Sequence, residues 1–128
     1  MLLTLTATAY ARQGPCGAEQ ANNAKAEAPT LHDWDSLNKS YTEYNNCDDG
    51  PVAAAYSQTV GRILIDHWDT LPQLDTLAKA NPDFSAFVLK HVDKTLSAGD
   101  IKQIAANAKT RCPQGLSGLC DDLKKQAH

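Results

Sequence analysis

The sequence lacks the features by which several large classes of protein are recognised. Its 128 residues carry 12 Lys and Arg against 15 Asp and Glu, so there is no excess of positive charge for nucleic-acid binding. No apolar run after the first dozen residues approaches the roughly 18–20 residues that span a bilayer. The chain is also short for two domains. We therefore predict one domain that neither binds nucleic acid nor spans a membrane.

Local motifs for catalysis, metals and cofactors are absent as well. The chain has no Gly-rich phosphate loop, no Gly-x-Ser-x-Gly elbow and no Cys/His nucleophile arrangement. No CxxC, His-x-x-x-His or Glu-x-x-His spacing offers a metal site, and residues 45–50 lack the alternating ligands of a calcium loop. We predict no metal, no cofactor and no catalytic residue, although a site assembled from distant residues would leave no local motif.

The first 31 residues divide into two predicted segments. Residues 1–11 are uncharged, apolar or small and end in Ala9-x-Ala11, a pattern that signal peptidase cleaves. Because no positive region precedes them, we interpret 1–11 as the rear part of a longer signal peptide. Residues 12–31 contain almost no large apolar side chain and are predicted to form a flexible arm. The remaining residues, 32–128, are predicted to form a single helical domain.

The chain has four cysteines, an even number that is typical of disulfides in an oxidising compartment: Cys16, Cys47, Cys112 and Cys120. This number favours a periplasmic or secreted protein. The segment between Cys112 and Cys120 is rich in Gly and Pro and can fold back, which favours that pair and leaves Cys16 for Cys47. A bridge between Cys47 and Cys112 stays open, because loop length separates the alternatives by only about 1–2 kcal/mol.

Helical periodicity dominates the chain from residue 33 onward. The spacing of apolar residues predicts an all-α protein, a compact irregular bundle of five to six short helices stapled by disulfides. Asp49 or Gly50, Asn81 and Ser97 are predicted caps, and Pro51 and Pro82 suit first turns. The predicted helices cover residues 33–45, 51–68, 71–80, 82–92, 98–109 and 117–126.

Two histidines with a nearby carboxylate are the best candidates for acid–base chemistry. His67 follows Asp66, and His91 lies two residues before Asp93. Both histidines fall on or beside the apolar stripe of a predicted helix, whereas the two carboxylates point to another side. We predict that both histidines are buried structural residues and that neither neighbouring aspartate orients them.

Charge is distributed unevenly along the predicted domain, with acidic residues in excess over 32–70 and basic residues in excess over 71–111. The acidic residues surround Trp34, Tyr41 and Tyr44 in sequence, and aromatic side chains with a charged rim are typical of protein-binding surfaces. We predict that a basic protein partner binds Asp33, Asp35, Glu43, Tyr44, Asn45, Asp48 and Asp49.

The stretch from Cys47 to Cys112, which begins NCDDGPVAAAYSQTVGRILIDHW and ends IAANAKTRC, is similar to small exported helical proteins of proteobacteria. The signal-like start, the small helical domain and the paired cysteines together resemble the immunity proteins of type VI secretion amidase effectors. This resemblance is one of general type and implies an inhibitor that occludes a secreted toxin, without assigning contact residues.

Two other functions remain open from the sequence. The first is a small periplasmic enzyme or ligand-binding protein, whose pocket would lie between the predicted helices 51–68 and 82–92. Tyr56, His67 and His91 would line that pocket. The second is a structural protein of the cell envelope with no dedicated partner.

Overall fold

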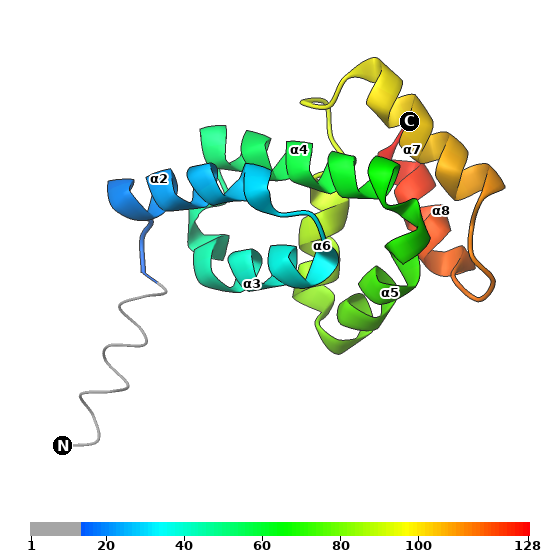
Figure 1. Cartoon of the computed structure of the whole chain (residues 1–128), viewed down its shortest axis with the longest axis horizontal. Coiled ribbons are helices and arrows are strands. Elements are labelled where there is room, and N and C mark those ends of the chain that lie inside the picture. Colours follow the sequence, from blue (N-terminus) through cyan, green and yellow to red (C-terminus); the bar gives the residue numbers. More distant parts are fainter. Residues whose placement is uncertain (1–13) are drawn as a thin grey trace.

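A computed structural model describes residues 14–128 (Figure 1). These residues form an all-α bundle of seven α-helices and three short 3-10 helices, and they contain no strand. The predicted fold class is therefore confirmed. In chain order the elements are α2 (Ala18–Glu27), η1 (Ala28–Thr30), α3 (Trp34–Tyr44), η2 (Asn45–Cys47), α4 (Gly50–Asp66), η3 (Trp68–Thr70), α5 (Leu71–Ala80), α6 (Pro82–Lys90), α7 (Ala98–Thr110) and α8 (Ser117–Gln126).

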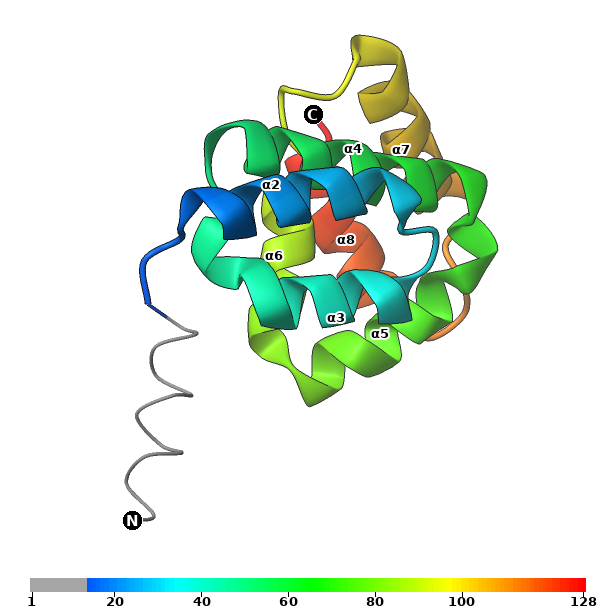
Figure 2. The same ribbon diagram turned by 60° about the vertical axis from the view of Figure 1, so that its left-hand side comes forward.

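The longest helix, α4, lies between two groups of helices. It packs against α2 and η1 on one side and against α7 on the other. Figure 1 shows α2 and α3 together at one end of the bundle and α7 with α8 at the other, and in the view of Figure 2 α8 lies behind α2 and α3. The consecutive helices α5 and α6 also pack together, as do α7 and α8. The core therefore extends along both sides of α4.

Side-chain caps explain where several helices begin. Asp33, Asn81 and Ser97 accept hydrogen bonds from backbone N–H groups in the first turns of α3, α6 and α7. Asp49 caps α4 by accepting from the N–H of Gly50 at 2.9 Å. Each of these side chains satisfies a donor that the helix itself leaves free. The predicted caps at Asn81 and Ser97 are confirmed, and Asp49 is the cap of α4.

Aromatic rings fill the core where α3, α4 and α6 meet. The ring centroid of Phe87 lies 4.7 Å from that of Tyr41, 5.3 Å from that of Tyr56 and 4.6 Å from that of His91. Tyr56 is fully buried, and its hydroxyl lies 2.7 Å from the hydroxyl of Ser40. The tilted and edge-on geometries are those that aromatic pairs prefer. Phe87 is therefore the centre of a ring cluster that joins three helices.

The prediction of a flexible arm over residues 12–31 is wrong for the part that the structure describes. Residues Ala18–Glu27 form α2, in which Ala24 is fully buried, as is Ala28 in η1. Alanine is the best helix former, and its small side chain lets α2 lie close to α4. A segment with few large apolar residues is therefore packed here through its alanines, so that scarcity did not mean disorder. The signal-peptide prediction for residues 1–11 lies outside the described residues.

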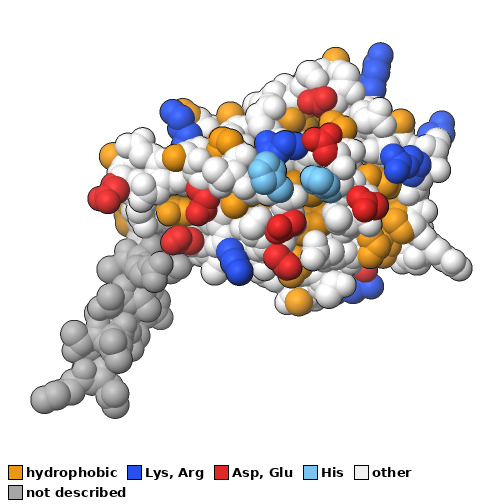
Figure 3. All heavy atoms as spheres, viewed as in Figure 1, with side chains coloured by type: hydrophobic (Ala, Val, Ile, Leu, Met, Phe, Trp, Pro, Cys, Tyr) orange, Lys and Arg blue, Asp and Glu red, His pale blue; other side chains and the backbone are white. Residues whose placement is uncertain are grey.

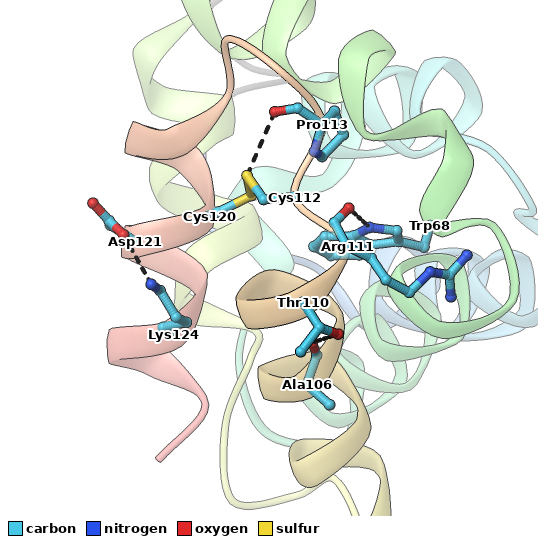
Figure 4. Close-up of a disulfide and its surroundings, with 9 residues drawn as sticks. All are labelled: Trp68, Ala106, Thr110, Arg111, Cys112, Pro113, Cys120, Asp121 and Lys124. Carbon is cyan, nitrogen blue, oxygen red and sulfur yellow. Dashed lines mark hydrogen bonds and ion pairs between the residues drawn. A yellow bond between two sulfur atoms is a disulfide. The ribbon is translucent and has the colours of Figure 1, made fainter.

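Both predicted disulfides are present, and the rival Cys47–Cys112 pairing is excluded. Cys16 bonds to Cys47, which fastens the start of α2 to η2, and the amide of Asn46 donates to the carbonyl of Gly14 at 2.6 Å beside it. Cys112 bonds to Cys120, which joins the segment after α7 to α8 (Figure 4). These bonds are consistent with an oxidising compartment.

The other end of α4 is fastened by a tryptophan. The indole Nε1 of Trp68 donates to the carbonyl oxygen of Arg111 at 2.8 Å, next to the Cys112–Cys120 bridge (Figure 4). Trp68 is 4% exposed, so its ring packs in the core while its N–H finds a partner. None of the helices in residues 14–128 has the length and apolar character of a membrane-spanning segment.

Candidate functional site

The residues predicted to bind a partner have different roles in the structure. Asp33 and Asp49 cap helices, and hydrogen bonds from Ser36 lower the pKa of Asp33. Asp35 is exposed and accepts from the amide of Gln73 at 3.3 Å. Glu43 and Asn45 are exposed near the end of α3, whereas Tyr44 is half-buried and packs against the core. Asp48 is held by internal contacts.

Two of the predicted residues, Asn45 and Asp48, line a shallow groove between α3 and α6 of about 350 Å³. We call it the α3–α6 groove. It is formed by Tyr41, Asn45, Asp48, Asp83, Ala86, Phe87 and Lys90. Burial raises the pKa of Tyr41, and the nearby charges of Asp83 and Asp48 raise it further. The groove therefore has an aromatic floor and a rim with two carboxylates and one ammonium group.

Asp48 forms the inner wall of the groove. Its side chain is 6% exposed, and its Oδ2 atom lies 2.6 Å from Nζ of Lys90. Its Oδ1 atom lies 2.9 Å from Nε2 of His91. Burial raises the pKa of Asp48, but the hydrogen bonds from His91 and Lys90 outweigh burial and hold that pKa below its usual value. The carboxylate is therefore charged and strongly held.

His91 lies directly behind this wall and is 1% exposed, so the prediction that it is buried is confirmed. It is the C-cap residue of α6. Its Nδ1 atom lies 2.7 Å from Oγ of Ser57 in α4, and its ring packs edge-on against Phe87. Both ring nitrogens thus have partners that come from other parts of the chain.

Asp93 is linked to His91 through Ser57, an indirect contact that the sequence did not predict. The hydroxyl of Ser57 donates to Oδ2 of Asp93 at 2.8 Å while its oxygen faces Nδ1 of His91. Residue 93 lies beyond the end of α6, so helical geometry does not fix its direction. Burial raises the pKa of Asp93, but hydrogen bonds from Thr95 and Ser57 lower it more. We call Asp48, Ser57, His91 and Asp93 the His91 network.

The prediction that His67 is buried is wrong. His67 is exposed, because α4 ends at Asp66 and the backbone of His67 leaves the helical conformation. Periodicity places a residue on a helical face only while the helix continues. His67 therefore does not contribute to a site with His91.

Asp48, His91 and Ser57 are the residue types of the catalytic triad of a serine hydrolase, but their geometry differs from that of a triad. Ser57 is fully buried and donates its proton to Asp93, so its oxygen is neither accessible to a substrate nor activated by His91. Two further hollows, of about 320 and 330 Å³, lie beside the Cys16–Cys47 bridge and beside Lys94. None of the three hollows is lined by Tyr56, His67 or His91.

No group of three or more His, Cys, Asp or Glu residues within 14–128 is arranged to hold a metal ion. The His91 network is thus a set of hydrogen bonds and ion pairs between protein groups. These contacts fix three segments together: the residues just before α4, the middle of α4 and the turn after α6.

Several residues of the site were not predicted from the sequence. Ser57 carries one local signal, since it is a polar residue inside the most apolar predicted helix. Asp83, Ala86 and Lys90 belong to the groove only because α6 packs beside α3, and no spacing within α6 indicates that.

Comparisons with protein-family models, with curated proteins and with solved structures all find no match to this chain.

Proposed function

We propose that the protein is an exported protein-binding module that holds a basic segment of its partner in the α3–α6 groove. The observation that carries this proposal is the composition of the groove, where the rings of Tyr41 and Phe87 form the floor and Asp83 lies exposed at the rim. Aromatic side chains supply much of the binding energy at protein interfaces, and opposite charge selects the partner.

The groove suits one or two long basic side chains. An Arg or Lys side chain can lay its carbon stem along the rings and bring its charge to Asp83, with a cation–π contribution from Tyr41. Asp48 adds negative potential at the inner end, although Lys90 offsets part of it. A volume of about 350 Å³ is at the small end of ligand pockets, which favours side chains over a larger ligand.

The surface around α3 carries further negative charge. Asp35 and Glu43 are exposed on α3, and Asp49 is exposed at the start of α4. Figure 3 shows acidic side chains spread over the face formed by α2, α3 and α4, with a few lysine and arginine side chains between them. Such a field speeds the approach of a basic partner and disfavours acidic ones.

The proposed function is an inhibitor of the immunity type that occludes a basic secreted effector in the periplasm. The two disulfides support the compartment, and the commitment of Ser57 and His91 to internal bonds supports binding over catalysis. Steric occlusion needs only a rigid surface, which a bundle with two disulfides provides.

The experiment is a comparison of two arginine substitutions at exposed alanines. Ala86→Arg fills the α3–α6 groove with a positive charge, whereas Ala106→Arg places the same charge on α7. Each tagged protein is exported in the source cell, purified from the periplasm and analysed by mass spectrometry. We expect one basic partner with the parent protein and with Ala106→Arg, and its loss with Ala86→Arg. Equal recovery with both variants, or a bound small molecule instead of a protein, would overturn the proposal.

A further inference from the structure

The hydrogen bonds of the His91 network fix the positions of its protons. Ser57 has one hydroxyl proton, and it points to Oδ2 of Asp93. Nδ1 of His91, 2.7 Å from the same oxygen, must then supply the proton of that contact. Nε2 faces both oxygens of the Asp48 carboxylate at 2.9 and 3.0 Å, and a carboxylate only accepts. All contacts are satisfied together only when both ring nitrogens carry protons.

The groups around the ring fit this charge. The negative groups facing His91 are Asp48, from the segment before α4, and Asp93, from the turn after α6. The positive group nearest to them is Lys90 of α6, which shares the Asp48 carboxylate. From α4, Tyr56 packs against the ring, and burial raises its pKa to about 12, so it is neutral. The positive charge of a doubly protonated, buried ring is therefore balanced by the two carboxylates.

A single proton on the ring leaves one contact unsatisfied. If the proton stays on Nε2, Ser57 must turn its hydroxyl toward Nδ1, and two oxygen atoms 2.8 Å apart are left with no proton between them. If it stays on Nδ1, the lone pair of Nε2 faces the Asp48 carboxylate at 2.9 Å. Two acceptors that face each other with no proton between them repel, so either Asp93 or Asp48 has to move.

We propose that His91 is a pH-sensitive clamp on the wall of the α3–α6 groove, holding it in shape while the imidazole ring carries two protons and loosening it when one proton leaves. Three groove residues depend on the ring directly: Asp48 binds it, Phe87 packs on it at 4.6 Å and Lys90 pairs with the same carboxylate. The effect of the clamp on partner binding rests on the proposed function. Its effect on the shape of the groove does not.

The first experiment is nuclear magnetic resonance on the full chain with both disulfides intact and with 15N-labelled histidine. Below the titration of His91 we expect both ring nitrogens to show the shifts of the doubly protonated ring. When the ring loses a proton, the amide signals of Asp48, Asp49 and Lys90 should shift at the same pH, whereas those of Leu123 and Lys124 in α8 should not. A ring that keeps the same number of protons at every pH at which the protein stays folded, or a titration that leaves the groove amides unchanged, would overturn the proposal.

A second measurement separates the clamp from the docking surface. A hexa-arginine peptide serves as the probe, and its affinity is followed across the titration of His91 in the parent protein, in His91→Gln and in the exposed control His67→Gln. We expect affinity about tenfold weaker above the titration for the parent and for His67→Gln, a typical coupling between sites, and no such step for His91→Gln. Binding without a step would overturn the clamp alone. Absence of binding at every pH, with the coupled amide shifts present, would instead contradict the docking surface.

Discussion

The two sides of α4 are built differently. On the side of α2, α3 and α6, the core contains the ring cluster around Phe87 and the His91 network. On the side of α7 and α8 it consists mainly of aliphatic residues, with Asn107 as a buried amide: Leu96, Ile104, Leu116 and Leu123. Rings and buried charges depend on orientation, whereas aliphatic contacts depend mostly on volume. The orientation-dependent contacts thus lie behind the α3–α6 groove, and the aliphatic side supports them.

The largest expected effect comes from the ring cluster. Phe87→Ala should lower the free energy of unfolding by about 3–5 kcal/mol, because the four surrounding rings cannot close the cavity. The exposed neighbour substitution Ala86→Arg should change it by less than about 0.5 kcal/mol. Denaturant melts of both variants make the comparison. A loss below about 1 kcal/mol for Phe87→Ala would show that this side of α4 does not depend on its rings.

Removal of each disulfide tests the two sides separately. Cys16 and Cys47 are 31 residues apart, and Cys112 and Cys120 are 8 apart. Chain entropy alone gives losses of about 4 and about 2.5 kcal/mol for the paired Cys→Ser variants. We expect the Cys16→Ser/Cys47→Ser protein to be the less stable in urea melts. The reverse order would mean that the α7–α8 side holds the bundle together more than the α2–α3 side does.

The smallest expected effect is on how the free energy of unfolding depends on acidic pH. Asp48→Asn should cost about 2 kcal/mol at neutral pH, since it weakens the ion pair with Lys90 and the hydrogen bond with His91. The pKa values of Asp48 and Asp93 are lowered in the folded protein, so their stabilisation is present above the unfolded pKa, near 4, and is lost as the pH falls through the folded values. The parent should therefore lose more stability between about pH 5 and pH 2 than Asp48→Asn does.

The control for this acid dependence is Asp122→Asn, which changes an exposed residue of α8 on the other side of α4. Its acid dependence should match that of the parent protein. Urea melts at several pH values measure all three proteins. If Asp48→Asn and the parent lose stability equally, the charge of Asp48 is not what holds the wall of the groove.

Local chemistry predicted much of the fold. Pro72 and the Asn81–Pro82 pair predicted the bounds of α5, and Asn81 and Pro82 marked the start of α6. The spacing of Leu119 and Leu123 predicted α8. They could do so because a helix begins and ends through groups next to it in sequence. The failure at α2 has a physical cause, since alanine forms helices well but gives little hydrophobic signal.

The site was less predictable, because its contacts join distant parts of the chain. The acidic residues in excess over 32–70 predicted that Asn45 and Asp48 belong to the site. The apolar stripe of the predicted helix 82–92 predicted that His91 is buried. The bonds from His91 to Ser57 and to Asp48 cross 34 and 43 residues, respectively. Periodicity describes one helix at a time, so it cannot show which residues of two helices meet.

The two tryptophans of the chain lie in different surroundings, and this gives each side of α4 its own optical signal. Trp34 is fully buried in α3, and Trp68 is fastened to Arg111 near the second disulfide. With Trp34→Phe or Trp68→Phe, the remaining indole reports fluorescence from one side alone. Coincident transitions of the two emissions would describe a single cooperative unit, and separate ones would describe sides that open independently.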